Sequence, residues 1–175
     1  MNLDQSIFNF IYNLSGENQL LDFLGVFFAD YAGYLLLLVV LITVFFFESW
    51  KKKIYYLSLI SLSTLISRGI ITELVRFFYY KSRPFEALEI TPLITEATKA
   101  AFPSGHMAFY TALILPMFLV DGRKGLYMGV IVALMGLARV FVGVHWPLDI
   151  LGGILTGLVS FYLVYKFILR GLESK

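Results

Sequence analysis

The chain contains no cysteine, only two histidines, and no lysine or arginine among its first 50 residues. The lack of cysteine excludes disulfide bonds and thiolate metal sites. The lack of basic residues at the start argues against a secretory signal peptide, whose first segment is positively charged. Linkers rich in Pro, Gly or Ser, low-complexity tracts and internal repeats are also missing, so we expect a single domain over residues 1–175.

Apolar residues dominate what is present. The composition is 59% hydrophobic and 17% aromatic, and the mean hydropathy is +0.80. These values are too high for a soluble domain of 175 residues. We therefore predict an all-α integral membrane protein whose partner is the bilayer and which binds no nucleic acid.

The apolar runs and their interruptions predict a bundle of five transmembrane helices. We expect a short interfacial helix over 4–14, because apolar side chains there recur at helical spacing. Residues 20–30 would extend the first span outward, and the long polar segment 81–102 would carry short helices near 85–88 and 94–100. A tight basic turn is expected over 121–125. The five spans are expected at about 31–47, 54–77, 104–120, 126–144 and 147–169.

The distribution of basic residues predicts the orientation, because short loops rich in Lys and Arg stay in the cytoplasm. Five crossings place three basic groups on one side: Lys51, Lys52 and Lys53; Arg123 and Lys124; Lys166, Arg170 and Lys175. The N-terminus, the segment 81–102 and the bend at 144–146 then face outward. This arrangement predicts an inner-membrane protein with a cytoplasmic C-terminus and its chemistry at the outer boundary.

The segment Phe102–His106 precedes the third predicted span and has the character of an anion site. Ser104 is a natural N-cap, which leaves the N–H groups of Gly105 and His106 free at the positive end of the helix dipole. A phosphate group suits such a position. We therefore expect Ser104 and Gly105 to help hold a lipid phosphate.

Three arginines are expected at the same depth, namely Arg76, Arg83 and Arg139. Arginine near the end of a span is costly, so each needs a reason to be there. Any one of them could reach the head groups or pair with Glu73 or Asp149. Three of them converging on a helix N-terminus instead favour a phosphate-binding cluster, since guanidinium groups bind phosphate oxygens two at a time.

Two histidines complete the predicted site. His145 and Asp149 are four residues apart, so the carboxylate can hold one imidazole nitrogen and leave the other free to attack phosphorus. His106 could protonate the leaving oxygen and then activate water. Either histidine alone would more often be a simple hydrogen-bonding residue at the membrane surface.

A metal site is the rival use of two histidines and a carboxylate. Three arginines would repel a divalent cation, and Asp149 is the only acidic ligand within the segments that carry the motifs. We therefore expect no metal and no cofactor. Helical spacing would place Glu73 within reach of Arg68 and Arg76, and we expect Glu73 and Arg68 to be structural.

The residues over 76–149 resemble the type 2 phosphatidic acid phosphatase superfamily. Its three motifs are Lys-x6-Arg-Pro, Pro-Ser-Gly-His and Ser-Arg-x5-His-x3-Asp. They occur here in order as Arg76-x6-Arg83-Pro84, as Pro103-Ser104-Gly105-His106, and as Ala138-Arg139-x5-His145-x3-Asp149. Two positions depart from the pattern: Arg76 replaces a lysine and Ala138 replaces a serine.

The resemblance implies a metal-independent lipid phosphatase that works through a phosphohistidine. His145 would be the nucleophile, Asp149 its support and His106 the acid. Arg76, Arg83, Ser104, Gly105 and Arg139 would hold the phosphoryl oxygens. The two departures touch neither histidine, so an active enzyme with altered affinity or substrate preference is expected.

Within the superfamily, the short chain, its Asn-rich amphipathic start and its compact outer loop are most similar to undecaprenyl pyrophosphate phosphatases of the bacitracin-resistance type. These recycle the lipid carrier of peptidoglycan synthesis. Phosphatidylglycerophosphate, phosphatidic acid and lipid A phosphatases remain alternatives. A lipid-phosphate transporter or binding protein that grips the head group without cleaving it is another.

Overall fold

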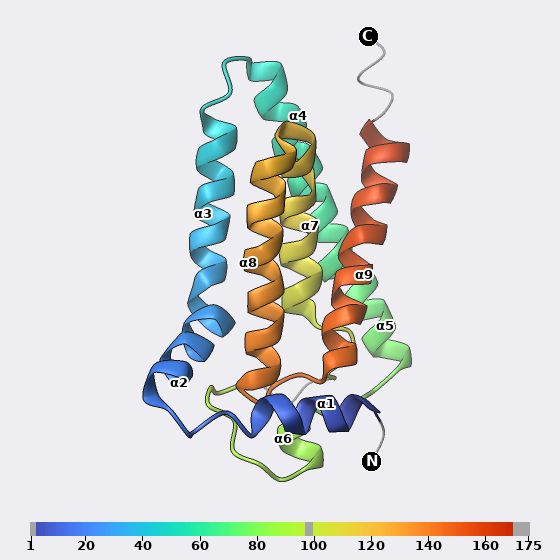
Figure 1. Ribbon diagram of the computed structural model, residues 1–175. Coiled ribbons are helices and arrows are strands. Elements are labelled where there is room, and N and C mark those ends of the chain that lie inside the picture. Colours follow the sequence, from blue (N-terminus) through green and yellow to red (C-terminus); the bar gives the residue numbers. More distant parts are fainter. Residues whose placement is uncertain (1–2, 97–99, 170–175) are drawn as a thin grey trace.

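The structure, a computed structural model, describes residues 3–96 and 100–169, and every regular element within these ranges is a helix. Long helical segments run up and down to form a bundle, and short helices cover one end (Figure 1). The short helices are α1 (Leu3–Tyr12) and α6 (Pro84–Ala87). The long segments, in which η marks a π-helical stretch, are α2–η1–α3 (Gln19–Val26, Phe27–Tyr31, Ala32–Phe45), α4–η2–α5 (Trp50–Thr64, Leu65–Ile71, Thr72–Phe78), α7 (Gly105–Val120), α8 (Gly122–Phe141) and α9–η3 (Pro147–Leu163, Val164–Leu169).

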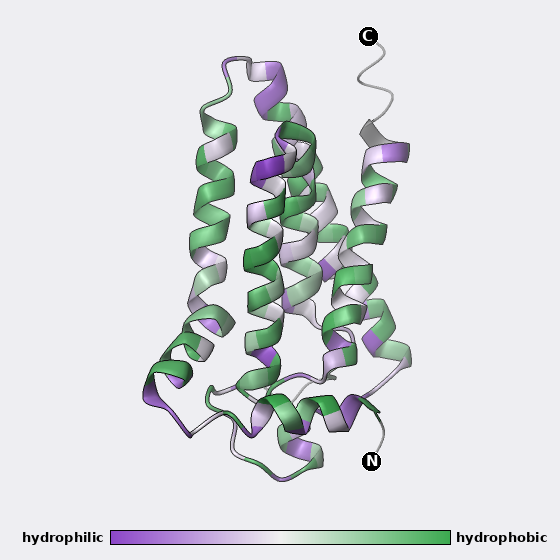
Figure 2. Cartoon of the chain, in the orientation of Figure 1, coloured by the Kyte–Doolittle hydropathy of each residue, from purple (hydrophilic) through white to green (hydrophobic). Residues whose placement is uncertain are grey.

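Four of the long segments in the described part of the chain are long and apolar enough to cross a membrane. Figure 2 shows that most residues of these segments are hydrophobic, whereas hydrophilic residues are more frequent towards the ends of the bundle. The remaining segment, α7, has only 16 residues. It contacts α3, α4, α8 and α9, and most of its side chains are buried, so it forms the centre of the bundle.

The start of α7 is fixed by the predicted cap and by close packing against α9. The Ser104 side chain accepts a hydrogen bond from the Met107 N–H at 3.4 Å, as an N-cap should. At Gly153 in α9, an added Cβ would lie 2.5 Å from the Ser104 carbonyl oxygen. Cβ atoms at Gly152 and Gly157 would likewise meet Phe102 and Thr111, both within 3 Å. These three glycines therefore allow α9 to pack closely against α7 and the segment before it.

Helix α1 lies across the end of the bundle and contacts α8 and α9 (Figure 1). Phe8 is fully buried, and its ring centroid is 5.0 Å from that of Trp146. The Tyr12 hydroxyl donates to the Thr91 carbonyl at 2.8 Å. Leu3 and Phe10 are exposed on the other face. The amphipathic helix predicted at the N-terminus is confirmed.

The predicted elements differ from the structure in two places. The turn expected over 121–125 is too long: α8 already begins at Gly122, because the Asp121 side chain caps it by accepting from the Arg123 N–H at 2.8 Å. Of the short helix expected over 94–100, Ile94–Glu96 are not helical and 97–99 lie outside the described residues. The short helix expected near 85–88 is present as α6, and the outward extension over 20–30 is present as α2 and η1.

The two ends of the bundle differ in charge. The end opposite α1 and α6 carries Lys51, Lys52 and Lys53 in the first turn of α4, Arg123 and Lys124 at the start of α8, and Lys166 in η3 (Figure 1). Arg170 and Lys175 lie outside the described residues. The predicted site residues all fall at the end that α1 and α6 cover.

Candidate active site

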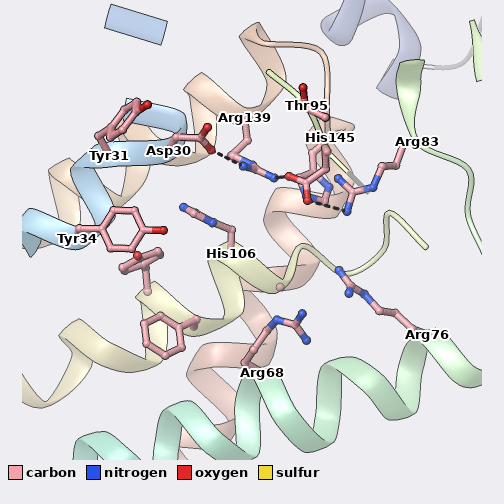
Figure 3. Close-up of a pocket in the computed structure, with 14 residues that line it drawn as sticks. Asp30, Tyr31, Tyr34, Arg68, Arg76, Arg83, Thr95, His106, Arg139 and His145 are labelled. Carbon is pink, nitrogen blue, oxygen red and sulfur yellow. Dashed lines mark hydrogen bonds and ion pairs between the residues drawn. The ribbon is translucent and has the colours of Figure 1, made fainter. Parts of the chain in front are cut away.

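A cavity of about 670 Å³ opens at this end of the bundle (Figure 3). Six of the eight residues that the sequence assigns to the site line it, and the other two, Ser104 and Asp149, are fully buried next to lining residues. The lining residues are Asp30, Tyr31, Tyr34, Arg68, Arg76, Arg83, Thr95, Glu96, Gly105, His106, Phe109, Tyr110, Arg139 and His145.

His145 lies in the loop between α8 and α9 and is almost completely buried. Its Nδ1 is 3.4 Å from Asp149 Oδ2, as the four-residue spacing predicts. Burial lowers the pKa of His145 to about 4, although the hydrogen bond to Asp149 acts in the opposite direction. The imidazole is therefore neutral at neutral pH. With Nδ1–H directed at the carboxylate, the lone pair on Nε2 is available for attack.

The carboxylate of Asp149 contacts Trp146 and Lys81 in addition to His145. Its Oδ2 accepts from the Trp146 N–H at 2.9 Å, which caps the start of α9. Its Oδ1 lies 2.9 Å from Lys81 Nζ. Such an anchored carboxylate can orient the imidazole of His145 and stabilise its charge once the ring becomes a cation.

Lys81 also binds Asp4 of α1, at 2.9 Å, and Asp4 in turn accepts from the Leu148 N–H at 2.9 Å. Burial opposes the charge on Lys81, but its hydrogen bonds to Asp149 and Asp4 raise its pKa above the usual value. Lys81 therefore supports Asp149 and does not line the cavity. Sequence reasoning missed Asp4, because nothing local predicts a contact with a lysine 77 residues away.

Arg83 and Arg139 reach the cavity from different segments and meet at one carboxylate. Arg139 comes from the last turn of α8 and forms an ion pair with Glu96 through Nη2. Arg83 precedes α6, donates to the Val144 carbonyl at 3.2 Å and lies 3.8 Å from Glu96. Arg139 is also 3.5 Å from Asp30. The predicted convergence of these arginines is present in the structure.

Glu96 is a site residue that the sequence did not reveal. Burial alone would raise the pKa of Glu96, but the nearby guanidinium groups of Arg139 and Arg83 together have the larger effect and lower it below its usual value. The side chain is therefore an anion at neutral pH. Burial lowers the pKa of Arg83 from its very high usual value. Two guanidinium groups that converge on one carboxylate also have the geometry to bind a phosphate.

The first turn of α7 forms the floor of the cavity. Among the described residues, His106 Nε2, Arg76 Nε and Arg139 Nε have no hydrogen-bond partner. The three atoms belong to residues that line the same cavity. Buried polar groups are normally paired, so these atoms mark a place suited to a polar ligand. The Ser104 side chain is engaged as the cap, and its expected contact with phosphate stays a prediction.

Arg68 and Arg76 come from the η2–α5 segment and share Glu73. Arg76 Nη1 is 3.4 Å from Glu73, and its Nη2 donates to the Pro103 carbonyl at 3.0 Å. Arg68 forms an ion pair with Glu73 and also lines the cavity. The structural pairing expected for Arg68 is confirmed, but the residue also has a place in the site that the sequence did not indicate.

Metal binding finds little support in the donor set. Within the described residues, no three His, Asp or Glu side chains cluster in a way that could hold an ion. Two histidines and four guanidinium groups around one cavity instead suit an anion that can be attacked by a nitrogen nucleophile. The expected absence of a metal stays a prediction.

Comparison with known proteins agrees with this arrangement. The sequence profile described as the PAP2 superfamily matches residues 57–172. Undecaprenyl-diphosphatase BcrC of Bacillus subtilis is 30% identical over 167 residues, covering 94% of this chain and 84% of the relative. Phosphatidylglycerophosphatase B of Bacillus subtilis is 38% identical over 91 residues, covering 45% of this chain and 44% of the relative.

A solved structure with a similar fold is the crystal structure of LpxE from Aquifex aeolicus. It is 24% identical, the alignment covers 95% of this chain and 97% of the other, and the TM-score is 0.76. The two proteins therefore share the same arrangement of helices.

Proposed function

Because the chain belongs to the PAP2 superfamily of membrane lipid phosphatases, we propose that it hydrolyses undecaprenyl pyrophosphate to undecaprenyl phosphate and phosphate. The reaction takes place at the outer face of the cytoplasmic membrane, without a metal, through a phosphohistidine. One observation carries this proposal: the buried His145–Asp149 pair adjoins a cavity that also holds His106 and four arginines.

In the first step, His145 Nε2 attacks the terminal phosphorus and the bond to the bridging oxygen breaks. The electron pair leaves with that oxygen, and His106 supplies its proton. Asp149 stabilises the imidazolium that forms when His145 becomes phosphorylated. In the second step, His106 takes a proton from water, the hydroxide attacks phosphorus, and the P–N bond breaks to release phosphate and neutral His145.

The cations stabilise the charge that develops on the transferred phosphoryl group. Arg76, Arg83 and Arg139 bind its peripheral oxygens, together with the N–H groups of Gly105 and His106 at the start of α7. Ser104 presents this helix end by capping it. Because the donors are buried and already oriented, little reorganisation is needed when charge moves.

The distribution of basic residues supports the orientation. With α7 as a fifth crossing, the termini lie on opposite sides of the membrane. The end that carries the three lysines at the start of α4 faces the cytoplasm under the positive-inside rule. The cavity then opens on the outer side, where α1 lies in the interface.

We name undecaprenyl pyrophosphate as the substrate because BcrC combines 30% identity with alignment over 94% of this chain, whereas the lipid A 4'-phosphatase of Porphyromonas gingivalis is 26% identical over 90%. The alternatives are phosphatidylglycerophosphate, phosphatidic acid and lipid A, and relatives with the first and last of these activities in their names also match. A protein that binds the head group without cleaving it would have no use for an imidazole held by a buried carboxylate.

The test is release of inorganic phosphate from undecaprenyl pyrophosphate by the purified protein in detergent with EDTA. The wild type and the control Arg123→Ala, changed at the opposite end of the bundle, should release phosphate at similar rates. His145→Ala should lower the rate by roughly a thousandfold or more. Full activity of this variant, or activity that EDTA abolishes, would refute the mechanism. Faster cleavage of another lipid phosphate would refute the assignment of undecaprenyl pyrophosphate as the substrate.

A further inference from the structure

We propose that Arg68 forms a second phosphate subsite, which binds the phosphate that stays on the lipid when a lipid diphosphate is cleaved. This inference rests on the proposed function and names a residue that selects the diphosphate. Arg68 lies outside the three motifs on which the sequence resemblance depends. It nevertheless lines the same cavity as His106 and His145.

The position of Arg68 relative to α7 is the first argument. A Cβ built on Gly105 would lie 2.5 Å from Arg68 Nε and 2.9 Å from its Cζ. The guanidinium group therefore rests against the residue that precedes His106. In the view of Figure 3, Arg68 is drawn on one side of the start of α7, which carries His106, and Arg139 and His145 on the other.

The chemistry of the proposed step assigns this position to the leaving group. A nucleophile and a leaving oxygen lie on opposite sides of the phosphorus in a direct displacement. If His145 attacks and His106 protonates the leaving oxygen, the rest of the substrate continues beyond His106. In a diphosphate, the next group there is the second phosphate, and it gains negative charge as the bridging bond breaks. Arg68 supplies a cation at that place.

The local backbone provides a second, independent argument. Arg68 lies in η2, a π-helical stretch over Leu65–Ile71 inside an otherwise α-helical segment. Residues five apart point about 140° away from each other on an α-helix, so Arg68 and Glu73 could not pair on a regular one. The wider turn brings them to one face, where they form an ion pair. Such stretches occur frequently at functional sites.

Exposure distinguishes Arg68 from the other arginines of the cavity. Its side chain is 40% exposed, whereas those of Arg76, Arg83 and Arg139 are 9%, 4% and 5% exposed. An exposed ion pair adds little to stability, so the fold does not explain why this arginine is held in place by Glu73. A position at the open side of the cavity suits a group that contacts the part of the head group nearest the lipid.

The test compares Arg68→Met with the wild type on farnesyl pyrophosphate and farnesyl monophosphate in detergent with EDTA. Methionine keeps an unbranched stem against Gly105 but removes the charge. We expect kcat/KM to fall by about tenfold to a hundredfold on the diphosphate and by less than about twofold on the monophosphate. Arg68→Lys should restore part of the loss.

A binding measurement separates this inference from the proposed function. Titration with inorganic pyrophosphate and with inorganic phosphate needs no turnover. Arg68→Met should weaken pyrophosphate binding by about tenfold and leave phosphate binding unchanged. Equal losses on both ligands, or no loss on pyrophosphate, would overturn the subsite even if the enzyme is active. Selective weakening without hydrolysis would support the subsite and contradict the proposed function.

Discussion

The two walls of the cavity are built in different ways. The α8–α9 wall consists of Arg139, His145 and Asp149 with the groups that hold them, Lys81 and Glu96. These contacts join segments 43 to 68 residues apart in the chain, and most of the side chains are buried. The η2–α5 wall consists of Arg68, Glu73 and Arg76. Its ion pairs are formed within a single helical segment, and Arg68 and Glu73 are exposed.

This difference separates two tasks. The α8–α9 wall holds His145, the proposed nucleophile, in a buried setting, so each charge in this wall needs a partner from elsewhere in the fold. The η2–α5 wall presents Arg68 at the open side, where the rest of the substrate must enter. We therefore expect changes in the first wall to affect every substrate, and a change at Arg68 to affect some substrates more than others.

The largest effect on this comparison is expected from Arg139→Ala. The change removes a cation proposed to bind phosphate and leaves the Glu96 carboxylate in the cavity without this partner, where it would repel an anionic head group. We expect kcat to fall by roughly a hundredfold to a thousandfold on both the diphosphate and the monophosphate lipid. Steady-state assays of the two substrates with EDTA provide the measurement.

The matched control is Arg139→Ala combined with Glu96→Gln. Removing the unpaired carboxylate should recover part of the lost affinity for substrate while kcat remains low. A selective loss on only one substrate would contradict the role given to the α8–α9 wall.

Removal of the cation behind Asp149 should produce the next largest effect. In Lys81→Met, the buried carboxylates of Asp4 and Asp149 lose their shared partner. We expect a loss of about 3 kcal/mol in the free energy of unfolding and a clear fall in kcat, because Asp149 no longer holds His145 firmly. Thermal unfolding in detergent and phosphate release would be measured together.

Lys81→Arg serves as the control, since it keeps the charge between the two carboxylates. It should be more stable than Lys81→Met. Unchanged stability and activity in Lys81→Met would show that the link from α1 to Asp149 has no consequence.

A smaller effect is expected at the contact between the η2–α5 wall and α7. In Gly105→Ala, the new methyl group forces Arg68 to move, because its Nε lies 2.5 Å from the added Cβ. We expect a loss of about threefold to tenfold in kcat/KM on the diphosphate. In the Arg68→Met background, the same change should cost much less. Equal losses in both backgrounds would mean that the methyl group acts on the phosphate directly.

The smallest effect is expected from acid. Burial lowers the pKa of His145 from its usual value of 6.5 to about 4. The imidazole therefore remains neutral at pH values well below 6.5. After correction for ionisation of the substrate phosphate, kcat/KM should change by less than about twofold between pH 7 and pH 5.5. An acid limb near pH 6.5 that His145 itself produces would contradict the buried setting of the nucleophile.

The comparison of the two walls also shows what the sequence could predict. Apolar runs and caps correctly predicted the long helices. The motifs and the count of membrane crossings predicted that the site residues lie together, and six of them line one cavity in the structure: Arg76, Arg83, Gly105, His106, Arg139 and His145. These predictions depend on local spacing and on counting membrane crossings. Local spacing and the number of membrane crossings can both be determined from a single sequence.

The supporting charges could not be predicted in the same way. Glu96 and Asp4 each pair with a cation from a distant segment, and many acidic residues in the chain would have been equally suitable partners. Arg68 was assigned a structural role because helical spacing does not reveal that it lies in a π-helical stretch and lines the cavity. The contacts of the outer loop with α8 and with the α8–α9 turn, such as Glu96 with Arg139 and Arg83 with Val144, form only when the fold brings these segments together.

The most direct test of the account is to trap the covalent intermediate. Because His106 acts in both proposed steps, the wild type would be mixed with a lipid pyrophosphate labelled in its terminal phosphate and quenched under alkaline conditions within a single turnover. Peptide mapping should then find the label on His145, and His145→Ala should carry none. Phosphate release with no labelled histidine, or a label on another residue, would contradict the central role of His145.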